Sequence, residues 1–312
     1  MKNKILITRK IDLSAVTILN EKFDVDYIAL NEPLSYNFLL DNIYKYDGVL
    51  STITEKFDEG IMEASKKKLK IISNMAVGTD NIDLKAADKY GIKVFNTPDV
   101  VTDSTADFTI ALGLSFLRQI IDANLFIKEN KWKKWDPDIF NGRSLRDLSW
   151  GIIGFGRVGK AVAERLKGFG IKIFYYDITE VNDSFNYDFV EYLEFDKLLK
   201  LSDVISIHTP LNENTKNLIN YPAFQKMSKK PLLINMARGA IINSFDLVNA
   251  LQEGLISGAA LDVFDPEPIS SDHPILKFKN VLITPHIGTA TIECRRDMAI
   301  MAAKNIIKFF ED

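Results

Sequence analysis

The chain has 312 residues, of which 46% are hydrophobic and 26% charged, with a net charge of −3 and a pI of about 5.8. These values are typical of a globular protein, and the length favours two domains of roughly 150 residues each. No basic patch stands out, so we expect no nucleic-acid partner. The single cysteine, Cys294, excludes an internal disulfide and a cysteine-based zinc site, and we expect no bound metal.

The N-terminal stretch MKNKILITRK has an apolar run of only three residues before TRK. That run is too short for the core of a signal peptide. No segment approaches the roughly 20 apolar residues of a membrane span. We therefore expect a cytoplasmic protein without a membrane partner.

Short β-rich runs alternate with helical patterns in the first part of the chain. The runs are KILIT (4–8), DGVLST (47–52), KIIS (70–73) and IKVFNT (92–97). Helical patterns follow Asp12 and cover 58–65. This alternation is typical of βαβ units built around a parallel sheet.

A long helix is predicted from about residue 103 to Ala123, and Ser104 and Asp107 have the spacing of a capping box at its start. The tract KWKKWDPDIFNGRS that follows, at 131–144, is rich in Trp, Pro and Gly. It is predicted to be a loop between the two series of strands.

A second series of strands begins at Trp150. The predicted strands are WGIIGF (150–155), 171–177, 203–209, 231–236, 258–264 and 280–285, and a helix follows from Thr289. This last helix has no strand partner of its own, so we expect it to pack on the first domain. The pattern predicts an α/β fold with two doubly wound parallel-sheet domains and crossings near 98–103 and 285–290.

The segment GFGRVG at 154–159 lies between a predicted strand and a predicted helix, which is the context of a dinucleotide-binding loop. Its first glycine permits a tight turn, its second lets the backbone approach a pyrophosphate, and its third lets helix and strand pack closely. The amides at the start of the helix face the phosphates. The simpler alternative is a tight turn without a ligand. We assign cofactor binding to Gly154, Gly156, Arg157, Val158 and Gly159.

Asp177 ends the next predicted strand, 23 positions after Gly154. A carboxylate there accepts hydrogen bonds from the ribose hydroxyls of NAD and repels the additional phosphate of NADP. The following stretch, ITEVND, contains no Lys or Arg that would reverse this preference. The sequence thus predicts NAD(H) over NADP(H).

Three polar residues follow successive predicted strands of the second series, namely Arg238, Glu267 and His286. The carboxyl ends of parallel strands line the ligand crevice of an open sheet, so we expect these residues to converge there. Reduction of a ketone by hydride needs a proton donor for the oxygen, and His donates and regains a proton near neutral pH. A neighbouring carboxylate favours the imidazolium, and an Arg recognises a carboxylate with two prongs.

Each of these three residues has a simpler explanation when it is taken alone. Arg238 fits a surface cation, Glu267 fits an exposed acid between prolines, and His286 fits a packed ring. Their occurrence together, beside a dinucleotide loop, favours an active site. The other histidines, His208 and His273, are interpreted as a loop neighbour and a structural residue, because neither has an acid and an arginine similarly placed.

Seven segments spread along the chain carry a recognisable pattern, namely NMAVGTDNID (74–83), NTPDVVTDSTAD (96–107), GIIGFGRVG (151–159), HTPL (208–211), INMARGAIIN (234–243), ALDVFDPEP (260–268) and TPHIGTAT (284–291). In these segments, and in their order and spacing, the chain resembles the D-isomer-specific 2-hydroxyacid dehydrogenases along nearly its whole length. The resemblance implies a Rossmann NAD-binding domain at residues 100–287, inserted in a flavodoxin-like substrate domain formed by 1–99 and 288–312.

The resemblance also implies roles for individual residues. Arg238 binds the substrate's carboxylate and carbonyl, and Glu267 pairs with His286, which is the acid in reduction and the base in oxidation. The backbone of Val77 and Gly78 holds the carboxylate from the first domain, so the cleft must close for turnover. Asp262 hydrogen-bonds the nicotinamide carboxamide. The cofactor cleft is further lined by Thr105, Thr209, Pro210, Ala237 and Gly288.

Within the family, formate dehydrogenases carry Gln at the position of Glu267, and phosphoglycerate dehydrogenases often carry a further C-terminal domain. The loops are most similar to the glyoxylate and hydroxypyruvate reductase branch, which implies NADH-dependent reduction of a small 2-ketoacid by a homodimer. A D-lactate-type or other 2-ketoacid reductase, and a non-enzymatic NAD(H)-sensing protein similar to co-repressors, stay open as alternatives. Trp132 and Trp135 either reach the partner's active site or pack a loop.

Overall fold

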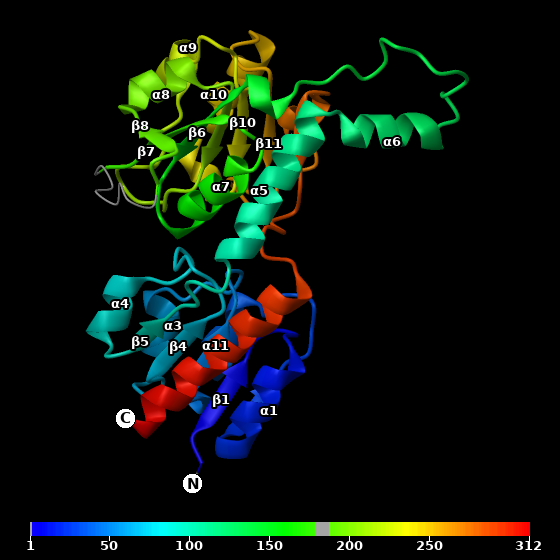
Figure 1. Ribbon diagram of the computed structural model, residues 1–312. Coiled ribbons are helices and arrows are strands. Elements are labelled where there is room, and N and C mark those ends of the chain that lie inside the picture. The colour runs from blue at the N-terminus through cyan, green and yellow to red at the C-terminus, as the bar shows by residue number, and fades with distance from the viewer. Residues whose placement is uncertain (1, 179–186) are drawn as a thin grey trace. The chain divides into compact units, whose positions relative to one another are not determined.

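The computed structural model describes residues 2–178 and 187–312 (Figure 1), so the ITEVND stretch lies outside the described residues from position 179 onward. The chain separates into two compact units. The first runs up to Val101 and includes Thr289–Asp312, and the second is Thr102–Gly288. The predicted α/β class with two parallel sheets is confirmed.

The first unit is built on a five-stranded parallel sheet in the order β2-β1-β3-β4-β5. This is the flavodoxin-like order, with its switch point between β1 and β3. The strands are β1 (Lys4–Ile7), β2 (Asp24–Tyr27), β3 (Gly48–Ser51), β4 (Ile71–Asn74) and β5 (Lys93–Phe95). The helices are α1 (Leu13–Lys22), α2 (Tyr36–Asn42), α3 (Glu59–Ala64), α4 (Leu84–Lys89) and α11 (Ile292–Glu311).

Helices cover both faces of this sheet, because alternate residues of each strand point to opposite sides. Ile5 and Ile7 share a core with residues of α1 and α11, whereas Leu6 shares one with residues of α2 and α3. The C-terminal helix α11 thus lies in the first unit, packed on β4 and α1. Strands β3 and β4 are buried throughout and are apolar over most of their length, as expected for the middle of a parallel sheet.

The second unit contains a seven-stranded parallel sheet in the order β12-β11-β10-β9-β6-β7-β8. The strand order reverses between β6 and β9, the arrangement of a Rossmann fold with one added strand. The strands are β6 (Ser149–Ile153), β7 (Lys172–Tyr176), β8 (Val190–Tyr192), β9 (Val204–Ile207), β10 (Leu232–Asn235), β11 (Gly258–Leu261) and β12 (Val281–Ile283). The helices are α5 (Thr102–Leu117), α6 (Ile120–Lys128), α7 (Arg157–Lys167), α8 (Phe195–Leu201), α9 (Tyr221–Lys226) and α10 (Ser244–Gln252).

The predicted capping box at the start of the long helix is wrong. Helix α5 begins at Thr102, so Ser104 and Asp107 lie inside it. Ser104 donates its hydroxyl to the carbonyl of Gly288 (2.9 Å), and Asp107 pairs with Arg165 of α7. Both side chains have tertiary partners in place of the local cap.

The predicted helix over 103–123 is also interrupted. Helix α5 ends at Leu117, Gln119 has a φ of +50°, and α6 begins at Ile120. The segment 131–144 contacts this break, where Arg143 donates its backbone N–H to the carbonyl of Leu117, the last residue of α5 (3.0 Å). The segment 131–144 contains neither helix nor strand, as predicted.

A buried carboxylate joins three segments where strands of the second sheet begin. Asp203 accepts hydrogen bonds from the backbone of Ser149 (3.0 Å), from Lys229 (2.8 Å) and from Arg143 (3.0 Å). Burial alone raises the pKa of Asp203, but the hydrogen bonds from Lys229, Ser149 and Arg143 outweigh burial and lower this pKa to about 2.

In the part of the chain that the structure describes, no single helix is both long and apolar enough to cross a membrane. Helices α5 and α6 meet those two criteria only when they are taken together, and they are bent by 61° at the break between them.

Candidate active site

The glycine loop lies between β6 and α7, at the switch point of the second sheet. Gly154 has a φ of +92°, and a Cβ at this position would lie 2.6 Å from the backbone nitrogen of Thr209. A Cβ on Gly159 would overlap the carbonyl oxygen of Gly154. These two glycines are therefore required by the backbone itself, which a side chain at either position would displace.

Gly156 differs from the other two, because a Cβ built on it meets no heavy atom of the described residues within 4 Å. It is also the N-cap of α7, and no side chain in the described part of the chain caps that helix. The first amides of α7 thus face open space with the positive end of the helix dipole behind them. This arrangement fits the pyrophosphate of a dinucleotide.

Asp177 lies just beyond the end of β7, half-buried beside the same loop. Its Oδ2 accepts a hydrogen bond from the backbone N–H of Phe155 (2.7 Å), and its Oδ1 accepts one from Ile178 (2.7 Å). The carboxylate is thereby fixed next to the glycine loop. This bond to Phe155 was not predicted, since the sequence gives no sign of which amide a carboxylate meets.

Arg238 stands on the loop that follows β10, and Asn235 holds that loop. The buried side chain of Asn235 donates to the carbonyl of Arg238 (2.9 Å) and accepts from the backbone N–H of Ala237 (3.0 Å). Arg238 itself is half-buried, and its Nη1 donates to the carbonyl of Ala237 (2.7 Å). Asn235 is thus a functional-site residue that the sequence did not reveal.

The loop that follows β11 carries Glu267 and lies directly against the Arg238 loop. A Cβ on Gly239 would overlap the carbonyl of Phe264 and lie 2.5 Å from the backbone nitrogen of Asp265, so this position must be glycine. Glu267 stands between two cis peptide bonds, Asp265–Pro266 and Glu267–Pro268.

His286 follows β12, and the structure brings it together with Glu267. The Nδ1 of His286 lies 2.8 Å from Oε1 of Glu267, and the two side chains are 26% and 34% exposed. A carboxylate acceptor at Nδ1 favours the tautomer with the proton on that nitrogen, and Nε2 is then the ring nitrogen that does not face Glu267. Arg238 follows β10, the neighbour of β11, and so lies at the same edge of the sheet.

The backbone of His286 has an unusual conformation, with a φ of +53°. Left-handed residues other than glycine cost on the order of 1 kcal/mol and are found where the surroundings hold them. Here the buried Asp262 stabilises the turn around His286. Its carboxylate accepts hydrogen bonds from the hydroxyl of Thr284 (2.6 Å) and from the amides of Ile287 (2.8 Å) and Gly288 (2.7 Å). That Asp262 binds the nicotinamide carboxamide stays a prediction.

In the first unit, three successive carbonyls of the loop after β4 accept hydrogen bonds. Ala76 O accepts from the backbone of Thr97 (2.8 Å), Val77 O from Asn96 Nδ2 (2.7 Å), and Gly78 O from Asn74 Nδ2 (3.0 Å). In a trans peptide the N–H points opposite to the carbonyl. The amides of Val77, Gly78 and Thr79 therefore point away from these partners, and among the described residues they have no acceptor. Successive free amides form an anion-binding concavity.

The remaining predicted cofactor residues lie around the glycine loop and the His286 turn. Thr105 is buried in α5, with its methyl group 3.9 Å from a Cβ built on Gly288, and Gly288 is itself buried. Thr209 is half-buried beside Gly154, Pro210 is exposed, and Ala237 is half-buried in the Arg238 loop.

The other two histidines differ in their surroundings. His273 caps a short helical turn by accepting from the backbone of Ile275 (3.2 Å) at Nδ1, and its Nε2 bonds the hydroxyl of Ser244 (3.1 Å). His208 follows β9, and its buried ring nitrogens have no partner in the described residues. Burial lowers the pKa of His208 to about 3, so its ring is neutral at physiological pH.

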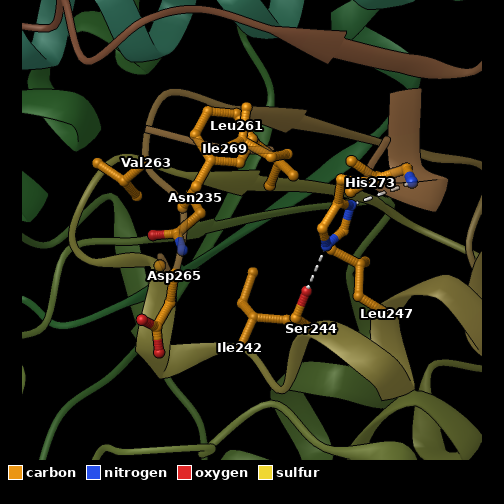
Figure 2. Close-up of a pocket in the computed structure, with 12 residues that line it drawn as sticks. Asn235, Ile242, Ser244, Leu247, Leu261, Val263, Asp265, Ile269 and His273 are labelled. Carbon is orange, nitrogen blue, oxygen red and sulfur yellow. Dashed lines mark hydrogen bonds between the residues drawn. The ribbon is translucent and has the colours of Figure 1, made fainter. Parts of the chain in front are cut away.

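A small cavity is lined in part by residues of the loops that follow β10 and β11, with Asn235 and Asp265 on one side and the Ser244–His273 pair on another (Figure 2). Its volume of about 30 Å³ suffices for a water molecule or two but not for a nucleotide. In the described residues, no group of three or more His, Cys, Asp or Glu side chains is placed to hold a metal ion.

A Rossmann sheet, a glycine loop with open amides, and an acid–imidazole pair at the carboxyl edge define a dinucleotide-dependent oxidoreductase. Residues 110–288 match the NAD binding domain of the D-isomer specific 2-hydroxyacid dehydrogenases. The chain therefore belongs to that family.

The chain is similar to a glyoxylate reductase of Thermococcus litoralis, with 41% identity over 99% of this chain and 94% of that protein. Among solved structures it is similar to the NADPH-dependent glyoxylate/hydroxypyruvate reductase of Sinorhizobium meliloti in complex with NADP and malonate, with a TM-score of 0.84, 29% identity, and 99% and 94% of the two chains covered. It is also similar to the D-lactate dehydrogenase of Aquifex aeolicus complexed with NAD and lactic acid, with a TM-score of 0.83, 28% identity, and 98% and 95% covered.

Proposed function

We propose that the protein reduces glyoxylate or hydroxypyruvate to the corresponding 2-hydroxyacid, with NADH as the reductant and the D-isomer as the product from hydroxypyruvate. The observation that carries this proposal is the 2.8 Å pair of His286 and Glu267, held at the carboxyl edge of a NAD-binding domain. The 41% identity to a glyoxylate reductase over 99% of the chain supports the substrate class.

Bound NADH supplies the hydride that adds to the 2-carbonyl carbon. The protein's part is to bind the ketoacid and to deliver one proton. We assign the carboxylate to the amides of Val77 and Gly78 and to the guanidinium of Arg238, which also polarises the carbonyl oxygen. His286 donates the proton from Nε2 to that oxygen, while Glu267 at Nδ1 stabilises the imidazolium before transfer. In the reverse direction the neutral ring takes the proton back.

We assign the cofactor preference to Asp177. Its carboxylate lies beside the glycine loop, bonded to the amide of Phe155, where a 2′-phosphate would meet a negative charge. The similar reductase of Sinorhizobium meliloti is NADPH-dependent, so family membership does not decide the preference. We expect catalytic efficiency with NADH to exceed that with NADPH by at least tenfold, and a clear preference for NADPH would contradict this role of Asp177.

A panel of ketoacids tests the proposal. Initial rates of NADH oxidation are measured with glyoxylate, hydroxypyruvate, pyruvate and phenylpyruvate at equal concentrations. We expect the first two to give the highest kcat/KM. Pyruvate as the best substrate would favour a D-lactate dehydrogenase, the second candidate, which the likeness to the Aquifex aeolicus enzyme supports. NADH binding without any ketoacid-dependent oxidation would instead indicate a sensing protein.

The same proposal includes a homodimer formed through helix α6. No residue of α6 is buried within the described part of the chain, although Ile120, Ile121, Leu125 and Ile127 are all apolar and about half exposed. Trp132 and Trp135, in the loop that follows, are 56% and 76% exposed. A second copy that packs on this exposed apolar surface would remove it from water. Sedimentation of Leu125→Glu beside the unaltered protein tests the dimer.

We further propose that the protein works in the cytoplasm. The chain has a single cysteine, Cys294, which is buried, and one cysteine cannot form an internal disulfide; this fits a reducing compartment.

A further inference from the structure

Two asparagine side chains frame the loop that carries Val77 and Gly78. Asn74, the last residue of β4, is fully buried, and its Nδ2 donates both to the carbonyl of Gly78 (3.0 Å) and to Oδ1 of Asn81 (3.0 Å). Its own Oδ1 accepts from the hydroxyl of Ser51 at the end of β3 (3.0 Å). Asn74 thus joins the end of one strand, the end of its neighbour and the loop between β4 and α4.

Asn81 closes the same loop from its other end. Its Nδ2 donates to the carbonyls of Thr52 (3.0 Å) and Glu55 (2.9 Å) in the turn after β3. That turn is itself held, because the buried carboxylate of Glu55 accepts from the backbone N–H (3.0 Å) and the hydroxyl (2.9 Å) of Thr52. The side-chain amide of Asn81 therefore links the loop after β4 to the turn after β3, which is itself held by hydrogen bonds.

The hydrogen bonds from Asn74 and Asn81 restrict the directions in which three backbone amides of the loop point. Rotation of the Gly78–Thr79 peptide would break the bond from Asn74, and displacement of the loop end would break both bonds from Asn81. We infer that Asn74 and Asn81 are positioning residues that aim the amides of Val77, Gly78 and Thr79 at one anion, and so set the affinity for the carboxylate of a 2-ketoacid. This inference rests on the proposed function, because it takes that carboxylate as the anion.

The chemistry requires an amide at position 81 and excludes an acid. Asn81 Nδ2 donates to two carbonyl oxygens and Asn81 Oδ1 accepts from Asn74. Aspartate has nearly the same shape but no donor, so it would place a carboxylate against two carbonyl oxygens with no proton between them. Asn81→Asp therefore removes the hydrogen bonds to the carbonyls of Thr52 and Glu55, while the volume of the side chain stays nearly the same.

The test compares Asn81→Asp with Asn42→Asp. Asn42 of α2 is a matched control in the same unit, because its Nδ2 also donates to a backbone carbonyl, that of Phe38 (2.8 Å), away from the loop. We expect Asn81→Asp to raise the KM for glyoxylate at least tenfold while kcat changes less than about twofold and the Kd of NADH is unchanged. Asn42→Asp is expected to change none of the three constants. A merely structural defect would lower kcat and weaken NADH binding as well.

Hydrogen exchange gives a second readout that needs no substrate. The amide of Thr97 donates to the carbonyl of Ala76 in the loop, so its exchange reports loosening of that loop. We expect Asn81→Asp to accelerate this exchange at least tenfold and Asn42→Asp to leave it unchanged. If Asn81→Asp does not fold, Asn81→Ala removes the same donors without adding a charge and is measured in its place.

The two proposals fail in different ways. If the unaltered protein reduces neither glyoxylate nor hydroxypyruvate, the proposed function is wrong, and the exchange of Thr97 still decides whether Asn81 holds the loop. If the unaltered protein reduces either ketoacid but a folded Asn81 variant has an unchanged KM, the positioning role is wrong and the proposed function stands.

Discussion

Gly156→Ala separates the cofactor role of the glycine loop from its structural role. The methyl group added at this position meets no heavy atom of the described residues within 4 Å, and the backbone there is extended, with a φ of −75°. Alanine restricts the unfolded chain, which stabilises by about 0.4–1 kcal/mol. It is also a poorer N-cap than glycine, which offsets part of that gain. We therefore expect the stability of the cofactor-free protein to change by less than about 1 kcal/mol, or roughly 2–4 °C in Tm.

The same methyl group lies where the pyrophosphate is expected to approach the backbone of α7. We expect the Kd of NADH to rise at least tenfold, which corresponds to a loss of about 1.4 kcal/mol. NADH fluorescence titration measures the affinity, and thermal unfolding without cofactor measures the stability. Gly168→Ala, at the other end of α7, is the control, because its nearest heavy atom would lie at 3.7 Å. Unchanged NADH affinity in a folded Gly156→Ala variant would refute the placement of the pyrophosphate.

Three further predictions concern side chains of the second unit. His286→Ala is expected to lower kcat at least about 100-fold while the Kd of NADH stays the same, because a general acid is lost; retention of most activity in single-turnover measurements would mean another donor. Asp262→Asn is expected to destabilise the protein by about 1–3 kcal/mol in urea unfolding, because one amide oxygen replaces two oxygens that accept three hydrogen bonds; an equally stable variant would show that these bonds do not hold the His286 turn. The lowered pKa of Asp203, about 2, is expected to contribute about 2 kcal/mol of stability that is fully present above about pH 4 and is lost as the pH falls through about 2. The stability difference between the unaltered protein and Asp203→Asn should therefore shrink between pH 5 and pH 2.

The central strands and the edge strands β5 and β12 could be predicted from the sequence, whereas the edge strands β2 and β8 could not. β9 and β10 are continuous, nearly apolar runs, VISI and LLIN, since both faces of a parallel sheet are covered. The missed strands, β2 (DVDY) and β8 (VEY), lie at sheet edges, carry charged residues and have no buried residue among those described. Their pairing depends on a neighbour that the local pattern does not identify.

The break between α5 and α6 shows a second limit of the sequence. The local residues, LRQI, contain neither Gly nor Pro, so nothing there predicts the end of a helix. The break depends on a loop that returns more than twenty residues later and supplies the amide of Arg143 to Leu117. A tertiary contact decides the outcome, and no local propensity encodes it.

The residues of the candidate site that follow strands could be predicted from the sequence, whereas the asparagines that support its loops could not. Glu267 and His286 follow successive strands, so the topology alone places them at one edge, and the structure has them 2.8 Å apart. Asn74, Asn81 and Asn235 each donate to at least one backbone carbonyl of a loop, and every loop offers many such groups. Only the folded backbone shows which of those groups an amide side chain meets.

The loop after β4, which carries Val77 and Gly78, binds an anion through main-chain groups in the proposed function. Its amides belong to the main chain, so no substitution of the residue that carries an amide removes the N–H unless proline is introduced. Side chains around the loop can therefore differ between relatives and change which ketoacid fits, while the main-chain amides still bind the carboxylate. Diversification of substrate within this architecture thus needs changes only at the periphery, provided that the amide side chains behind the loop are kept.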